Sequence, residues 1–186
     1  MKKYRPLILG MGLLLVLAVC GGAVAIFLPP EDVINLSAVR LPGEAIGREW
    51  TGPSGLVVQD FQVLSGDSED EKKTIAILRA QLAPAGVIGV ADFTYRQKGN
   101  PLSQVTVKIY VFQSSEQCQK WIQDKYQAPG WESLYRKVKK TGCLCFDSQL
   151  DKIRIAATGR VLIMSSSQDH SDIHLKALDL YLKRLW

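Results

Sequence analysis

The chain has 186 residues, of which 47% are hydrophobic and 22% charged, a composition typical of a folded chain with a real core. Three of its 23 basic side chains precede an apolar segment, which leaves 20 basic against 18 acidic side chains in the remainder. This near balance gives no basis for nucleic-acid binding, and that class of function is excluded.

The first feature along the chain is a run of 22 residues without a charge, residues 7–28. As a helix it would be about 33 Å long, enough to cross a hydrocarbon core of about 30 Å. Lys2, Lys3 and Arg5 precede it, and Glu31 and Asp32 follow it. The positive-inside rule then predicts a cytoplasmic tail at residues 1–6, a transmembrane signal anchor at 7–28, and an extracytoplasmic remainder in a single-pass membrane protein.

Two other fates of this segment remain open. The sequence Leu17-Ala18-Val19-Cys20-Gly21 resembles a bacterial lipobox, which implies lipidation of Cys20. It departs from that pattern because Val19 is bulky and the residues after Cys20 stay apolar. A cleaved signal peptide has a shorter apolar core than this one. All three alternatives predict a domain on the outer face of the membrane, with the lipid bilayer as a partner.

Residues 29–50 are predicted to be a linker, because Pro29-Pro30, Pro42-Gly43 and Gly47 oppose regular structure. Gly52-Pro53-Ser54-Gly55 predicts a turn before a first strand at 56–63. The domain itself is expected to span 51–186.

Helices and strands then follow in alternation. Ser68 with Glu71, and Ser114 with Gln117, have the spacing of capping boxes and predict helices that end near Pro84 and Pro129. Between those helices, alternating apolar residues predict a hairpin. The remaining expected elements are strands at 143–148, 151–157 and 161–165 and a helix from about 168 to 186. The fold class is therefore α+β, a mainly antiparallel sheet of about 5–6 strands with about 3 helices, for which a ferredoxin-like or related split arrangement is plausible.

The exported part holds three cysteines. Cys143 and Cys145 are two apart on a predicted strand, so a bond between them would be strained, and Cys118 with either one is the better disulfide. Buried free thiols remain an alternative, as does a thiol-dependent redox or metal-binding site built from Cys143 and Cys145. Metal sites usually need four ligands, which no nearby residues supply.

The histidines give no stronger signal. His170 and His174 have the i, i+4 spacing of a metal pair, but Ser171 is a predicted helix cap and leaves His170 outside the helix. No catalytic, cofactor or phosphate-binding motif is present, so no cofactor is predicted.

One dense cationic run stands out near the middle of the domain. Arg136, Lys137, Lys139 and Lys140 follow Trp131. A solvated loop or short helix is the plain interpretation, and contact with anionic lipid headgroups or an acidic partner is the functional one. We therefore expect a membrane-anchored, non-enzymatic binding or interaction domain at the cell envelope, which recognises a protein partner or a small ligand.

Overall fold

A computed structural model describes residues 34–61, 68–130, 134–168 and 172–185. The chain divides into two compact units, residues 1–34 and residues 35–186, and the description below concerns the second. The predicted tail, anchor and lipidation site at Cys20 lie outside the described residues. Within the described residues, no helix is both long and apolar enough to cross a membrane.

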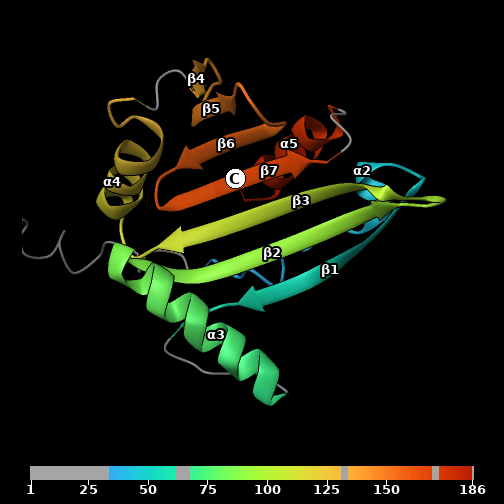
Figure 1. Cartoon of the computed structure of the whole chain (residues 1–186), viewed down its shortest axis with the longest axis horizontal. Coiled ribbons are helices and arrows are strands. Elements are labelled where there is room, and N and C mark those ends of the chain that lie inside the picture. The colour runs from blue at the N-terminus through green and yellow to red at the C-terminus, as the bar shows by residue number, and fades with distance from the viewer. Residues whose placement is uncertain (1–33, 62–67, 131–133, 169–171, 186) are drawn as a thin grey trace, which may run out of the picture. The chain divides into compact units, whose positions relative to one another are not determined.

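The second unit is an α+β domain with a seven-stranded antiparallel sheet and four helices (Figure 1). In chain order the elements are α2 (Gly43–Ile46), β1 (Trp50–Val58), α3 (Glu69–Leu82), the short 3₁₀ helix η1 (Ala83–Ala85), β2 (Val87–Gln97), β3 (Asn100–Phe112), α4 (Ser115–Tyr126), β4 (Tyr135–Val138), β5 (Leu144–Ser148), β6 (Ile153–Thr158), β7 (Val161–Ser167) and α5 (Ile173–Leu185).

The strand order is β1-β2-β3-β7-β6-β5-β4. Two meanders, β1 to β3 and β4 to β7, meet where β3 pairs with β7. Every connection joins neighbouring strands except the one from β3 through α4 to β4, which crosses to the far edge of the sheet. The α+β class is as predicted, but the order is not the split ferredoxin-like arrangement. The sequence also missed a strand and a helix, β4 and α2, because both are only four residues long and carry no periodicity.

Local sequence signals explain the best-predicted elements. Both capping boxes form: the Ser68 hydroxyl accepts from the Glu71 N–H at 3.2 Å, and the Ser114 hydroxyl accepts from the Gln117 N–H at 3.3 Å. The hairpin of β2 and β3 also forms, with alternate residues of β3 buried on one face.

The first strand differs from its prediction. It begins at Trp50, so the glycine- and proline-containing segment lies within β1 and not before it. The segment disturbs the register between Thr51 and Ser54, and β1 is an edge strand, where proline and bulges are tolerated. A Cβ on Gly55 would come within 1.7 Å of the Asp92 carbonyl oxygen, so this close approach of β1 to β2 requires glycine.

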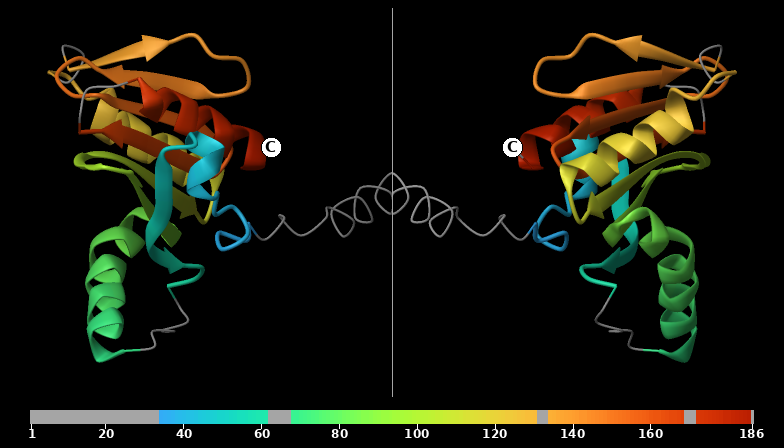
Figure 2. Two further views of the ribbon diagram at one scale, coloured as in Figure 1. Left: turned by 90° about the vertical axis from the view of Figure 1, so that its right-hand side faces the viewer. Right: turned by 90° about the vertical axis from the view of Figure 1, so that its left-hand side faces the viewer.

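The sheet separates two apolar cores. The turned views of Figure 2 show helices on both sides of the sheet. On one face α4 and α3 contribute Cys118, Ile122 and Ile75 to a cluster with Phe112, Phe146 and Leu162. On the other face lies α5, whose Tyr181 stacks on Phe93 with ring centroids 5.7 Å apart. Adjacent strand residues point to opposite faces, so each strand serves both cores.

Much of the segment expected as a linker belongs to the domain. Leu36, Val39, Ile46 and Trp50 are all buried. The Tyr95 hydroxyl donates to the Leu41 carbonyl at 3.0 Å. The folded unit therefore starts near residue 35 and not at 51, because the prolines and glycines there shape turns and a short helix that the sheet and α5 cover.

Candidate functional site

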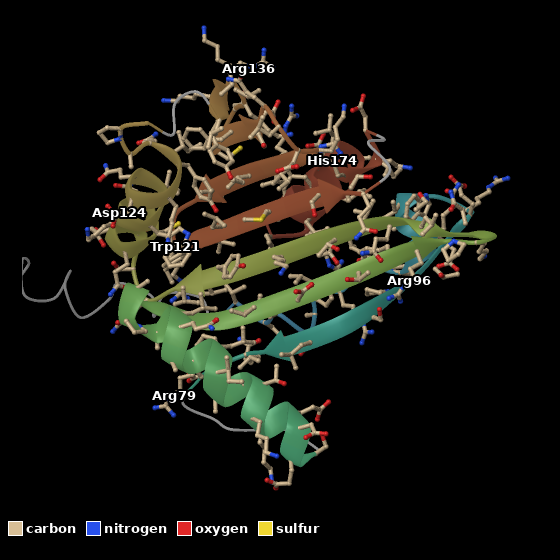
Figure 3. All side chains as sticks on the ribbon, viewed as in Figure 1. Arg79, Arg96, Trp121, Asp124, Arg136 and His174 are labelled. Atoms are coloured by element: carbon tan, nitrogen blue, oxygen red, sulfur yellow. The ribbon has the colours of Figure 1, made fainter. Side chains whose placement is uncertain are left out.

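The cationic run lies on the hairpin of β4 and β5, at one edge of the sheet, where Figure 3 marks Arg136. Tyr135 to Val138 pair with β5, and Lys139 and Lys140 lead into the following turn. Arg136 and Lys137 thus belong to an edge strand, whereas Lys139 and Lys140 lie in a loop, as the plain interpretation expected. Its start is fixed by aromatic packing: Tyr135 meets Tyr126 of α4 edge-on, with ring centroids 5.0 Å apart. Trp131 lies outside the described residues.

The four cations of this run have different surroundings. Arg136 is opposite Asp147, and its guanidinium lies 4.0 Å from that carboxylate. Lys140 forms an ion pair with Asp179 of α5. Lys137 and Lys139 are exposed and have no acidic partner in the part of the chain that the structure describes. Two positive charges of the run therefore remain uncompensated.

A shallow groove of about 690 Å³ follows these lysines. We call it the β4–β5 groove; its lining residues are Lys137, Val138, Lys139, Lys140, Thr141 and Cys143. Three of the six are cationic and none is acidic. Such a lining favours an anionic occupant over a neutral or cationic one.

A partly buried ion pair joins the hairpin of β4 and β5 to the next strand, β6. Arg154 of β6 forms two hydrogen bonds with Asp147 of β5, the Nη2–Oδ2 bond being 2.6 Å long, and both side chains are only 20% exposed. The hydrogen bonds to Asp147 raise the pKa of Arg154. Charge-assisted pairing of this kind fixes side-chain geometry as well as adding free energy. Asp147 thereby fixes the side chain of Arg154 and lies next to Arg136 of the cationic run.

The cysteines are free thiols in the structure. Cys118 belongs to α4 and is buried in the same core cluster as Phe146. Cys145, the neighbour of Phe146 on β5, points to the opposite face of the sheet. The structure therefore does not bring Cys118 together with Cys145, and the predicted disulfide stays a prediction.

The thiol environments oppose nucleophilic chemistry. Burial raises the pKa of Cys118 and of Cys145 to about 11. Burial also raises the pKa of Cys143, against an opposing effect of nearby Lys140. A reactive cysteine needs a lowered pKa, because the thiolate is the nucleophile.

No metal centre emerges from the described residues either. They contain no group of three or more His, Cys, Asp or Glu side chains placed to hold an ion. His174 is buried in the first turn of α5, and His170 lies outside the described residues, so the predicted i, i+4 pair cannot be assessed.

Sequence reasoning found the cations but not their partners. Asp179 is 39 residues from Lys140, and Asp147 reaches Arg136 only because β4 and β5 pair in one particular register. Comparison of the chain with protein-family models, with curated proteins and with solved structures gives no match.

Proposed function

We propose that the chain is a non-enzymatic binding domain, held at the outer face of a membrane, which contacts anionic lipid headgroups through the β4–β5 groove. The observation that carries the proposal is the lining of the groove, which has no acidic residue and holds Lys137 and Lys139, two lysines without an acidic partner among the described residues. The predicted anchor at residues 7–28 supports a lipid partner, because a tether keeps the domain at millimolar effective concentration near the bilayer. Weak headgroup affinity is then sufficient for contact.

The character of the groove also favours headgroups over a small ligand. It is shallow, and its cations belong to an edge strand and a turn. Lysine ammonium groups are strongly hydrated point charges that suit many anion geometries, whereas selective carboxylate or phosphate recognition usually uses the planar fork of arginine. The rival proposal, redox or metal chemistry at Cys143 and Cys145, is opposed by the raised pKa values of both thiols.

Vesicle binding of residues 35–186 tests the proposal. Each lysine near an anionic surface contributes about 1 kcal/mol, so Lys137→Gln with Lys139→Gln should weaken binding to vesicles containing 30% phosphatidylserine roughly 30-fold. Binding of the unmodified domain should fall as salt rises, since the Debye length shortens. Cosedimentation across a range of lipid concentrations measures both effects.

The matched control removes the same charge elsewhere. Lys72 and Lys73 lie on α3, where their ammonium groups are 2.9 and 4.0 Å from Glu69 and Asp70. The double change of these two residues to Gln should leave vesicle binding close to that of the unmodified domain. Equal losses in the two variants, or binding to neutral vesicles alone, would contradict the proposal. Retention on an acidic protein but not on anionic vesicles would instead favour a protein partner.

The membrane attachment has its own test. An uncleaved anchor gives the mass of the whole chain in the membrane fraction. Lipidation at Cys20 would remove residues 1–19 and add acyl groups, and simple cleavage would remove the apolar segment without adding mass. Mass spectrometry of the intact protein, recovered from the membrane and soluble fractions, separates the three outcomes.

A further inference from the structure

A second hollow region lies between α3 and α4, away from the β4–β5 groove. A cavity of about 400 Å³ runs along the end of α3, and another of about 370 Å³ lies against α4. Pro84 lines both, so the two hollows adjoin at this residue, and we call the pair the α3–α4 groove. In Figure 3, Arg79 projects from α3, and Trp121 and Asp124 project from α4, the two helices that bound it.

The floor of the α3–α4 groove is apolar. Ala76, Ala80 and Ala83 line it on one side, with Pro84 in the middle and Trp121 on the other side. Trp121 is held by two aromatic neighbours, Phe112 and Tyr110, at centroid distances of 5.9 and 6.4 Å. On the α4 side the groove is therefore bounded by the indole of Trp121, which its aromatic neighbours hold in place. On the α3 side it is bounded by small alanine side chains, which leave the surface close to the helix backbone.

The rim of the groove is cationic. Lys120, Lys125 and Arg79 contribute three positive charges, and Asp124 contributes one negative charge. Asp124 is already paired with Lys120 at 3.0 Å. The Lys125 ammonium lies over the Trp121 ring, 5.5 Å from its centroid, directly beside the apolar floor. Apolar surface and net positive charge thus meet at Trp121.

We propose that the α3–α4 groove binds a single-chain anionic amphiphile, with its acyl chain over Pro84 and the alanines and its carboxylate at Lys125 beside Trp121. Charge complementarity selects an anionic head, and the apolar floor selects a hydrocarbon tail. An extended peptide fits the floor less well, because backbone N–H and C=O groups laid on alanine and proline side chains would find no hydrogen-bond partners. This site is separate from the β4–β5 groove and does not depend on its function.

Dodecanoate, below its micelle concentration, is the probe. Residues 35–186 form one compact unit. Titration calorimetry of this unit should show saturable binding of about one molecule of dodecanoate. Affinity should rise about fourfold for each methylene added between octanoate and dodecanoate, because each added methylene is buried in the groove. Dodecanol, which lacks the charge, should bind at least tenfold more weakly.

Two matched substitutions on α3 locate the site. Ala80→Glu places a carboxylate in the groove and should weaken dodecanoate binding at least tenfold. Ile77→Glu, at a side chain that is 57% exposed and does not line either cavity, should leave binding unchanged. Both positions are exposed on a helix, so neither change threatens folding; circular dichroism of each variant verifies this.

The head position is tested by Lys125→Gln. This variant should lose the preference for dodecanoate over dodecanol while still binding dodecanol. Absence of saturable binding, or equal affinities of the Ala80→Glu and Ile77→Glu variants, would overturn the proposal. Binding of an acidic amphipathic peptide that depends on Ala80, without dodecanoate binding, would also overturn it and assign the groove to a protein. The Lys137→Gln and Lys139→Gln variant should bind dodecanoate normally, which separates this site from the β4–β5 groove.

Discussion

The cationic run places four positive side chains within five consecutive residues, and the structure gives these side chains different partners. Arg136 faces Asp147, whereas Lys137, the next residue, is opposite Phe146 on the other face of the sheet. Lys140 is neutralised by Asp179, and Lys139 has no acidic partner within the described ranges. The charge available to an anionic partner is therefore concentrated on Lys137 and Lys139, although the sequence presents all four cations alike.

The thiols make a second prediction at this scale, which concerns alkylation of residues 35–186. At pH 8, iodoacetamide should modify Cys143 slowly and leave Cys118 and Cys145 unmodified, because these two are fully buried and have pKa values of about 11. The rate at Cys143 should rise about tenfold for each pH unit while its raised pKa stays above the pH. Peptide mass spectrometry after timed quenching measures each site.

The same experiment under denaturing conditions tests the predicted disulfide. All three cysteines of residues 35–186 should react in denaturant without reductant, as free thiols do. Modification of one cysteine alone would indicate a bond between the other two. Fast reaction of Cys145 in the folded domain would revive the redox proposal.

At the scale of elements, α3 and α4 each begin with a capping box but differ in how much of their surface packs against the sheet. Only Ile75 of α3 is buried, whereas α4 buries Cys118, Ile122 and Tyr126. Packing of an apolar face supplies most of the stability of a helix in a protein. Opening of α3 should therefore precede global unfolding, and opening of α4 should not.

Removal of each cap makes this difference measurable. Ser114→Ala should lower the free energy of unfolding by about 1 kcal/mol, because the first turn of a packed helix loses its hydrogen-bond partner. Ser68→Ala should change that free energy less, while it speeds amide hydrogen exchange throughout α3. Urea titration and exchange mass spectrometry on the two variants form a matched pair. Equal protection of α3 and α4 in the unmodified domain would contradict the expectation.

The elements that the sequence predicted well are those with a local physical cause. The capping boxes and the β2–β3 hairpin depend on residues within a few positions of one another. By contrast, β4 carries two consecutive cations and becomes a strand only because β5 pairs with it and Tyr126 packs on its first residue. The β1 segment reads as a turn, because its glycines and proline are local signals that an edge strand can absorb.

The largest difference between expectation and structure appears at the scale of the whole molecule, in the extent of the folded unit. A chain that begins at residue 51 lacks four buried side chains, Leu36, Val39, Ile46 and Trp50. Burial of such a side chain contributes about 1.5–3 kcal/mol, so their loss costs roughly 6–12 kcal/mol. This is comparable with the whole stability of a typical domain, about 5–15 kcal/mol.

Truncation tests this boundary. Residues 35–186 should unfold cooperatively on heating, and residues 51–186 should show no cooperative transition. Circular dichroism during thermal unfolding, with size-exclusion chromatography before heating, compares the two chains. A cooperative transition of the shorter chain at the same temperature would show that the segment from 35 to 50 is a linker after all.

The candidate site follows the same pattern at this scale. Its charges are visible in the sequence, but the β4–β5 groove exists only because a turn folds Lys139 and Lys140 back toward Cys143. The α3–α4 groove is less visible still, since its alanines and its tryptophan are separated by about 40 residues and meet only through the strands between the two helices. The spacing of residues within one helix or strand carries no information about which residues of different elements come into contact.

The hydrogen bond from Arg184 to the Ala38 carbonyl, 3.2 Å long, has a consequence for the connectivity of the domain. It brings the first and last segments of the folded unit side by side, as the ends of many domains are. A circular permutant that joins residue 185 to residue 35 through a short glycine-serine linker, and opens at the exposed turn Lys98-Gly99, would keep the order of the sheet unchanged. In this permutant β3 would be the first strand of the chain and β2 the last. The two strands would still pair in the sheet, although no turn would connect them.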